Sequence, residues 1–317
     1  MIDSFKKIKL IAVVGPTASG KTSLGVKIAE HFGGEVISAD SMQIYKGMDI
    51  ATAKPAKEEM HGIKHHLIDF LPADKEYSVA SYILDAKRAV SEVVSGKQLP
   101  VIVGGTGLYV DSFLNNITFL DGANESRVRD ELKKRLSLEG AEVLYKELQK
   151  IDPDAAKKIH PNNTVKVIRA LEVYYSNGKT ITQQVKESKN VPSPYEPLYI
   201  GITRKDRNKL YDSINKRVDC MLENGLLDEA REYYSKEHSK TAVNAIGYKE
   251  LKPYLDGEKE LSECVEELKK ATRHYAKRQL TWFGRNEKIN WFYSDCYSDP
   301  DEMYGQVFSL INNFLGR

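Results

Sequence analysis

Cysteine is scarce in this chain of 317 residues, which has only three. Cys220, Cys264 and Cys296 are odd in number and far apart, and no C-x-x-C pair is present that could begin a zinc site. Unpaired cysteines of this kind are typical of proteins that work in a reducing compartment. We therefore expect a cytoplasmic protein without a structural zinc ion.

Long apolar runs are also missing. No stretch approaches the ~18 apolar residues of a membrane span, and residues 1–7 lack the apolar core of a signal peptide. Charge is nearly balanced, with 47 Lys and Arg against 45 Asp and Glu, and the formal net charge is +2. A surface that binds nucleic acid must therefore be a local patch of positive charge, because the chain as a whole carries almost no net charge. We expect a soluble monomer with no membrane contact.

The strongest motif is a glycine-rich run near the start of the chain. The run is Gly15-Pro16-Thr17-Ala18-Ser19-Gly20-Lys21-Thr22 and fits G-x-x-x-x-G-K-[ST], a loop whose backbone amides surround phosphates. An apolar run over residues 9–14 precedes it and a helical pattern over 23–29 follows, which is the order that such a site needs. Lys21 would place a charge between phosphates, and the Thr22 hydroxyl would reach a Mg²⁺ ion. The motif predicts a site for a di- or triphosphate.

The wider pattern predicts an α/β fold: a P-loop NTPase-like core with a parallel sheet flanked by helices, plus an all-helical insertion domain. Residues 1–122 alternate strand-like runs (10–14, 36–38, 101–103) with helical patterns, as crossover connections require. Strand signals vanish over residues 123–190, where leucines and valines recur at helical spacing. A proline-rich linker over 191–197 opens the second part of the core, residues 191–317, with strands expected at 198–202 and 288–293.

Further short motifs follow one another along the chain. They are DSMQIY (40–45), MDIATAKP (48–55), HHLID (65–69), GGTGLY (104–109), IRALEVY (168–174), RVD (217–219), GLLDE (225–229), AIGYKE (245–250) and TRHYAKRQLTWF (272–283). Together with the phosphate loop they resemble the bacterial tRNA dimethylallyltransferase family, also called the tRNA isopentenyltransferase or IPP transferase family. The resemblance runs from the phosphate loop to Trp282, and the motifs occur in the family's order.

The resemblance implies an enzyme that transfers a dimethylallyl group from dimethylallyl diphosphate to N6 of adenosine 37, directly 3′ of the tRNA anticodon, with Mg²⁺. The phosphate loop would then hold a diphosphate leaving group and not ATP. An exocyclic adenine amine is a poor nucleophile because its lone pair is delocalised into the ring. The reaction therefore needs a base for the proton and positive charge for the leaving group.

The resemblance also assigns the catalytic residues. Asp40 stands at the family's base position, and Thr106 at the position that aligns the adenine amine with Asp40. Lys21, Thr22, the loop amides and Arg217 would neutralise the diphosphate.

Contacts with tRNA are implied for three groups of residues. The first faces the target adenosine, which must leave its stack to reach Asp40; here Gln43 offers a donor and an acceptor to an adenine edge. The second would meet the anticodon stem-loop from the insertion. The third is a basic cluster that shares one helical face. The first group is Asp40, Ser41, Met42, Gln43 and Thr106. The second group is Arg127, Val165, Lys166, Val167, Ile168 and Arg169. The third group is Arg273, Lys277 and Arg278.

Each assignment has a plainer alternative. An aspartate such as Asp40 after the second strand of a P-loop fold is often a Mg²⁺ or water-shell ligand. His65 and His66 look like a metal pair, but adjacent residues point apart and a structural role is favoured. The glycines of 104–107 fit a tight turn, Arg217 an ordinary surface arginine, and the basic cluster a solvated face.

Three rival functions remain open at this point. An adenylate isopentenyltransferase shares the core motifs but uses a free nucleotide, and the helical insertion argues against it because a mononucleotide needs no such clamp. A P-loop small-molecule kinase and an RNA-binding protein with a nucleotide switch are the other two.

The chain departs from the family pattern in a few places. Ala51 replaces a common glycine, Lys166 a common arginine, and Gly284 a common arginine. Lysine does not reproduce the planar fork of arginine, so RNA contacts near 166 and 284 need not follow the family's. The zinc-finger extension of some eukaryotic relatives is absent.

Overall fold

The computed structural model describes residues 7–117, 125–189 and 191–317. It divides into two compact units, one formed by residues 1–113 with 194–317 and the other by residues 114–193. The boundaries expected from the sequence, between 122 and 123 and at 190, lie outside the described residues. No helix of the described part is both long and apolar enough to cross a membrane.

The described part of the first unit contains one parallel sheet of six strands in the order β3-β2-β4-β1-β5-β6. The strands are β1 (Ile8–Val14), β2 (Gly34–Ser38), β3 (His65–His66), β4 (Leu99–Gly104), β5 (Tyr195–Thr203) and β6 (Ile289–Tyr293). The predicted fold class is confirmed. β1 pairs with β4 and β5, so the strand that leads into the phosphate loop lies inside the sheet.

Two details of the strands differ from the prediction. β5 begins at Tyr195, within the segment predicted as a linker, because residues 195–201 pair with residues 8–14 of β1. Pro197 is accommodated in that strand, although proline cannot donate a ladder hydrogen bond. β3 is only two residues long, and so short a strand leaves no periodic signal in the sequence.

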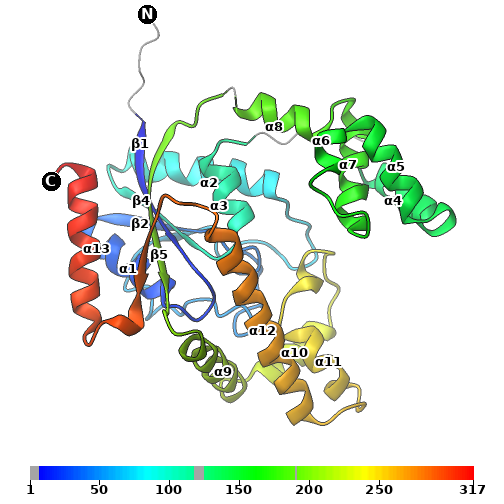
Figure 1. Cartoon of the computed structure of the whole chain (residues 1–317). Coiled ribbons are helices and arrows are strands. Elements are labelled where there is room, and N and C mark those ends of the chain that lie inside the picture. Colours follow the sequence, from blue (N-terminus) through cyan, green and yellow to red (C-terminus); the bar gives the residue numbers. More distant parts are fainter. Residues whose placement is uncertain (1–6, 118–124, 190) are drawn as a thin grey trace, which may run out of the picture. The chain divides into compact units, whose positions relative to one another are not determined.

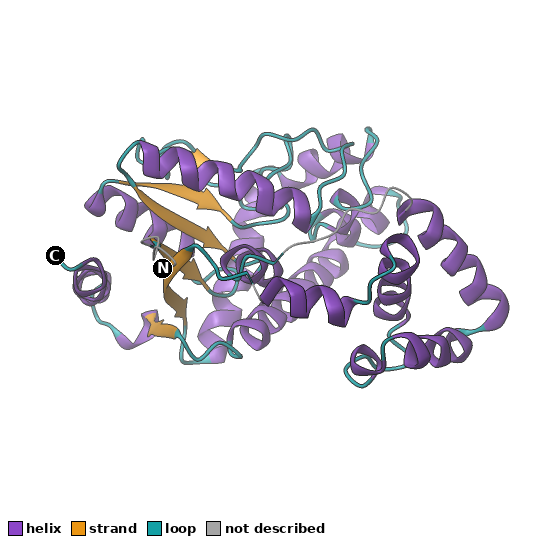
Figure 2. Ribbon diagram, turned by 90° about the horizontal axis from the view of Figure 1, so that it is seen from above, coloured by secondary structure: helices purple, strands orange, loops and turns teal. Residues whose placement is uncertain are grey.

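Helices cover both faces of the sheet (Figures 1 and 2). Alternate residues of β1, Ile11 and Val13, belong to a core shared with α1 (Lys21–Phe32) and α13 (Pro300–Leu315). α2 (Val79–Ser95) contacts β2 and β4, and α3 (Gly107–Leu114) follows β4.

Four more helices of this unit gather beyond the carboxyl ends of the strands (Figure 1). They are α9 (Arg207–Glu223), α10 (Leu226–Tyr234), α11 (Tyr248–Leu255) and α12 (Leu261–Phe283), and they contact one another in sequence order and through an α9–α12 pair. Short 3₁₀ turns lie at Ala242–Asn244 and Ser294–Cys296.

The second unit is helical throughout its described residues. Its elements are α4 (Glu125–Glu139), α5 (Ala141–Ile151), α6 (Pro153–Ala156), α7 (Thr164–Asn177) and α8 (Ile181–Lys189). Leu132, Leu144, Leu148 and Leu171 form its core. The helical periodicity of 123–190 is therefore explained by a small core that this segment builds for itself.

Candidate active site

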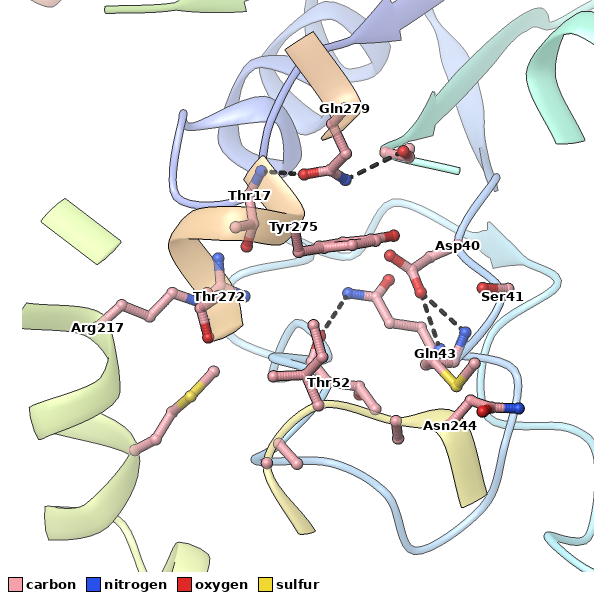
Figure 3. A pocket seen from close by; sticks show the side chains of 18 of the residues that line it. Thr17, Asp40, Ser41, Gln43, Thr52, Arg217, Asn244, Thr272, Tyr275 and Gln279 are labelled. Carbon is pink, nitrogen blue, oxygen red and sulfur yellow. Dashed lines mark hydrogen bonds between the residues drawn. The ribbon is translucent and has the colours of Figure 1, made fainter. Parts of the chain in front are cut away.

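A cavity of about 350 Å³ opens in the first unit where the parallel strands end (Figure 3). The cavity is lined by residues of the phosphate loop, of the segment after β2 and of the end of β4, together with residues of α9, α12 and 244–247. Ligands of open α/β sheets bind at this edge, because the loops and helix N-termini after the strands converge there. The cavity brings together segments that lie more than 200 residues apart in the chain.

The phosphate loop is held by contacts that only glycine allows. Gly15 has φ +148°, and a Cβ atom there would lie 2.2 Å from the Ile202 carbonyl oxygen of β5. Gly20 has φ +91° and caps α1, which starts at Lys21. The free amides of that helix N-terminus suit an anion. Of the eight predicted loop residues, Thr17, Lys21 and Thr22 line the cavity.

Two cationic side chains, Lys21 and Arg217, line the cavity. The Lys21 ammonium donates to the Pro16 carbonyl, and burial, followed by the charge of Arg217, lowers the pKa of Lys21 to about 7, although Asp40 opposes the shift. Burial also lowers the pKa of Arg217, against the attraction of Asp40 and Glu59. Cations that disfavour each other in a desolvated site are stabilised when an anion arrives. The site therefore suits a diphosphate.

Asp40 stands at the carboxyl end of β2 with its two oxygens in different roles. Oδ1 accepts hydrogen bonds from the backbone amides of Met42 at 2.9 Å and Gln43 at 3.3 Å. No hydrogen bond from the described residues reaches Oδ2, and Figure 3 shows the carboxylate facing the cavity beside the Tyr275 hydroxyl. One oxygen thus fixes the side chain while the other is available to accept a proton.

Thr106 is joined to Ser41, the residue after Asp40, and is not among the residues that line the cavity. The Thr106 hydroxyl oxygen accepts from the Ser41 amide at 3.1 Å, and the Thr106 amide donates to the Ala39 carbonyl at 3.2 Å. Gly104 permits this approach, since a Cβ atom there would lie 2.2 Å from the Ala39 carbonyl oxygen. The turn after β4 is therefore joined to the segment that carries Asp40, and its glycines serve close packing as well as turning.

Gln43 is more restricted than its sequence suggests. Its Nε2 donates to the carbonyls of Thr52 at 3.2 Å and Ala53 at 3.0 Å, which uses both amide hydrogens. The expectation of a donor and an acceptor toward an adenine edge is corrected: only Oε1 remains for a ligand. These two acceptors could not be predicted from sequence patterns, because the carbonyls belong to an irregular turn after Gln43.

Sequence reasoning missed Gln279 of α12 as a residue of the site, and Tyr275 of the same helix also lines the cavity. The Gln279 side chain is buried, accepts from the Thr17 amide at 2.8 Å and donates to the Gly105 carbonyl at 3.0 Å. It therefore joins the phosphate loop to the turn before Thr106 (Figure 3). The signal was present as an i, i+4 pair of polar residues within the motif of residues 272–283.

Gln279→Leu is expected to lower the free energy of unfolding by about 1–3 kcal/mol for each buried group left unpaired, here the Thr17 amide and the Gly105 carbonyl. Chemical denaturation measures the change. Gln149→Leu, at an exposed glutamine of α5, is the matched control, with an expected change within about 0.5 kcal/mol. Equal stabilities of the two variants would contradict the bridging role.

The basic residues of α12 do not share one face. Arg273 donates to Asn215 of α9 at 2.6 Å, and Lys277 borders a small hollow with Arg207. Arg278 instead lines the main cavity, with its guanidinium over the Tyr275 ring at 5.5 Å. The expectation of one common face is therefore wrong, because five residues along a helix turn the direction by about 140°.

Trp282 of the same cluster has a structural role. Its indole donates to Asp111 at 2.6 Å, and its ring packs on Gly107, where a Cβ atom would lie 2.2 Å from the ring. Gly284 ends α12 with a right-handed backbone and needs no special conformation.

The predicted stem-loop residues of the second unit fall into different environments. Arg127, Val165 and Lys166 are exposed. Val167 and Ile168 are buried in the core of the unit, at 2% and 8% exposure, so their side chains are not available to RNA and these two assignments are corrected. Helical spacing explains the error, since a run of five consecutive residues on a helix covers more than one turn and therefore includes both its exposed and its buried face.

Arg169 also has a structural partner within the second unit. It forms an ion pair at 3.2 Å with Glu172, a fully buried carboxylate that Arg129 also contacts at 3.0 Å. Removing one partner of a buried charge leaves the other uncompensated. Changes at Arg169 therefore test stability as well as RNA contact.

The histidine pair has separate structural partners. His66 Nε2 lies 2.5 Å from a Glu35 oxygen, and His65 Nδ1 lies 2.9 Å from the Ile63 carbonyl. Nowhere in the described part of the chain do three His, Cys, Asp or Glu side chains gather as a metal site.

The donors in the cavity suit a metal that the substrate helps to hold. The Thr22 hydroxyl and the Asp40 carboxylate line the same cavity. Mg²⁺ is usually bound by one or two protein oxygens together with phosphates and water. The residues present fit that mode and do not form a self-sufficient metal cage.

Comparisons with known proteins place the chain in a family. A phosphate loop, two cations and a carboxylate line one cavity at the carboxyl ends of a parallel sheet, as in a P-loop-type enzyme. The chain belongs to the IPP transferase family, whose model matches residues 43–287.

Relatives and solved structures match over nearly the whole chain. It is 47% identical to tRNA dimethylallyltransferases of Thermoanaerobacter sp. (strain X514) and Bacillus subtilis (strain 168), over 96% of this chain and 98% and 97% of theirs. The tRNA isopentenylpyrophosphate transferase structure of Bacillus halodurans has a TM-score of 0.72 at 43% identity, covering 97% and 96% of the two chains. A eukaryotic dimethylallyltransferase that acts on tRNA has a TM-score of 0.83 at 29% identity, covering 98% of this chain and 80% of its own.

Proposed function

We propose that this chain is a tRNA dimethylallyltransferase that moves a dimethylallyl group from dimethylallyl diphosphate to N6 of adenosine 37, next to the anticodon. The observation that carries the proposal is the cavity itself: Lys21 and Arg217 lie in the same hollow as a carboxylate with an unengaged oxygen. Transfer of an alkyl group from a diphosphate to an amine needs both features at once.

At the phosphate end, the amides of Gly15–Thr22 with Lys21 and Arg217 stabilise the charge that develops on the leaving diphosphate. Thr22 would hold a Mg²⁺ ion together with the diphosphate oxygens, and the ion would supply further positive charge there. A kinase would use the same loop, so the other end of the cavity is what distinguishes the two functions.

At the adenine end, Asp40 Oδ2 accepts the proton that N6 loses. The N6–C bond forms as the C–O bond to the diphosphate breaks, and the bonding electrons leave with the diphosphate. The hydrogen bonds to Oδ1 keep the carboxylate in place during this change. Thr106, which is joined to Ser41, is assigned the role of aligning the amine with Asp40.

The helical unit of residues 114–193 supports tRNA as the acceptor. It has its own core, and none of the residues that line the cavity belongs to its described part. We propose that this unit binds the anticodon stem-loop through Arg127, Val165 and Lys166. Arg169 contributes in part, because it also pairs with Glu172. A free nucleotide acceptor would leave this unit without a role. Cytoplasmic location and a monomeric state stay predictions from the sequence.

The proposal is tested by offering the protein ATP and dimethylallyl diphosphate in parallel. Only dimethylallyl diphosphate is expected to support transfer of a group to the acceptor. Inorganic diphosphate should compete with dimethylallyl diphosphate for the phosphate loop. Release of ADP coupled to phosphorylation of an acceptor would favour a kinase instead.

Arg127→Glu is expected to weaken the affinity for anticodon stem-loop RNA and to reduce the salt dependence of binding by about one phosphate contact, while binding of dimethylallyl diphosphate is unchanged. Binding isotherms at several salt concentrations measure both. Arg88→Glu, at an exposed arginine of α2, is the control. An Arg127 variant that bound RNA like the parent at low salt would remove this residue from the interface.

A further inference from the structure

The carboxylate of Glu229 is surrounded by donors from a distant segment. Oε2 accepts from the amides of Asp49 at 2.8 Å and Ile50 at 2.7 Å, while Oε1 accepts from the amide of Ala51 at 2.9 Å and the hydroxyl of Tyr248 at 2.9 Å. Three consecutive amides that converge in this way form a nest for an anion. Here a side chain 178 residues or more away in the chain fills it.

The nest holds the turn that orients Gln43. The carbonyls of Thr52 and Ala53, directly after the three bound amides, accept the two hydrogens of Gln43 Nε2. Ala53 has φ +47°, a conformation that an alanine keeps only where its surroundings impose it. The Thr52 hydroxyl, which donates to the Met48 carbonyl at 2.6 Å, closes the same turn.

Three sequence motifs that the reaction itself does not use meet at this contact. The bound amides belong to the motif of residues 48–55, Glu229 ends the motif of residues 225–229, and Tyr248 belongs to the motif of residues 245–250. Gly247 has φ +122°, and a Cβ atom there would lie 2.9 Å from that of Ala51, so the second motif also packs on the turn. The unusual Ala51 fits because it needs no positive φ and its methyl meets a glycine.

Gln43 and the turn line the cavity beside Asp40. With both amide hydrogens engaged, Gln43 presents only an acceptor. An acceptor attracts the 6-amino group of adenine and repels the 6-carbonyl oxygen of hypoxanthine. A Gln43 side chain free to turn over would present its donor and lose that preference.

We propose that Glu229 is a positioning residue for base selection: by holding the turn of residues 49–53 it keeps Gln43 in the acceptor orientation, so that the cavity takes a 6-aminopurine and rejects a 6-oxopurine. This inference rests on the proposed function, because it concerns the base that enters the cavity.

Glu229→Gln tests it in the full-length protein. The variant keeps the size of the side chain, but its amide group places a donor against the amides of the turn. The probes are two anticodon stem-loops that differ only in the target nucleotide, adenosine or inosine, and the measured quantity is the ratio of their dissociation constants. The parent is expected to prefer adenosine by about tenfold or more, and Glu229→Gln to reduce that ratio several-fold. Diphosphate binding should be unchanged.

Two controls separate positioning from a loss of structure. Glu232→Gln changes an exposed carboxylate of the same helix whose partner is Lys236, and should leave the ratio unaltered. In a Gln43→Ala background, Glu229→Gln should change the ratio no further, since the residue through which it acts is gone. Tyr248→Phe, which removes one of the four donors, should shift the ratio in the same direction by less.

A merely structural Glu229 would weaken both stem-loops equally and leave the ratio at the parent value, and this result would overturn the inference. Additive effects in the Gln43→Ala background would overturn it as well. A parent protein that failed to prenylate the adenosine stem-loop would instead contradict the proposed function. The two failures are therefore distinguishable.

Discussion

Asp40→Asn is expected to lower the turnover number by about two to four orders of magnitude while RNA and diphosphate binding change little. Asparagine keeps an oxygen that accepts from the Met42 and Gln43 amides, so the local turn is preserved. What it loses is the second carboxylate oxygen, which we propose accepts the N6 proton. Single-turnover kinetics with saturating substrates measure the chemical step directly.

The same variant separates the base role from the alternative of a Mg²⁺ ligand. A ligand role predicts weaker binding of metal or diphosphate and partial recovery with added Mg²⁺. Near-normal turnover would remove Asp40 from the mechanism. Asp212→Asn, at an exposed carboxylate of α9, should leave the rate unchanged.

Lys21→Ala is expected to reduce kcat/KM for dimethylallyl diphosphate by about two to three orders of magnitude, because one of the two cations that stabilise the leaving group is gone. The affinity for stem-loop RNA should stay at the parent value, since no RNA contact is assigned to Lys21. Steady-state kinetics with varied dimethylallyl diphosphate provide the measurement.

Lys27→Ala serves as the control for this change, because Lys27 lies on the same helix and forms a surface ion pair with Glu30 at 3.7 Å. It should retain the parent's kinetics. A Lys21 variant with normal kcat/KM would show that the phosphate loop does not hold the leaving group.

The fold was predictable where the signal is local. The run into the phosphate loop combines an apolar strand, two glycines with positive φ and a helix start within 14 residues of chain, and the structure reproduces it. The start of β5 was not predictable, because pairing with β1 decides it and the sequence shows only prolines. Tertiary contacts overrule local propensity there.

The site shows the same division. The motifs identified which segments meet, and the structure brings the phosphate loop, Asp40 and Arg217 to one cavity. The hydrogen-bond partners of individual side chains could not be predicted from the sequence. Gln43 donates both amide hydrogens to backbone carbonyls, and Gln279 joins two loops through hydrogen bonds. Burial of Val167 and Ile168 depends on which face of α7 meets its neighbours, and a motif does not specify that.

The most direct test of the account is a mass measurement. The protein is incubated with Mg²⁺ and dimethylallyl diphosphate, and with either anticodon stem-loop RNA or AMP as the acceptor. The stem-loop is expected to gain the mass of one dimethylallyl group, at the adenosine next to the anticodon, and AMP is expected to gain none. A gain on AMP with an unmodified stem-loop would contradict it.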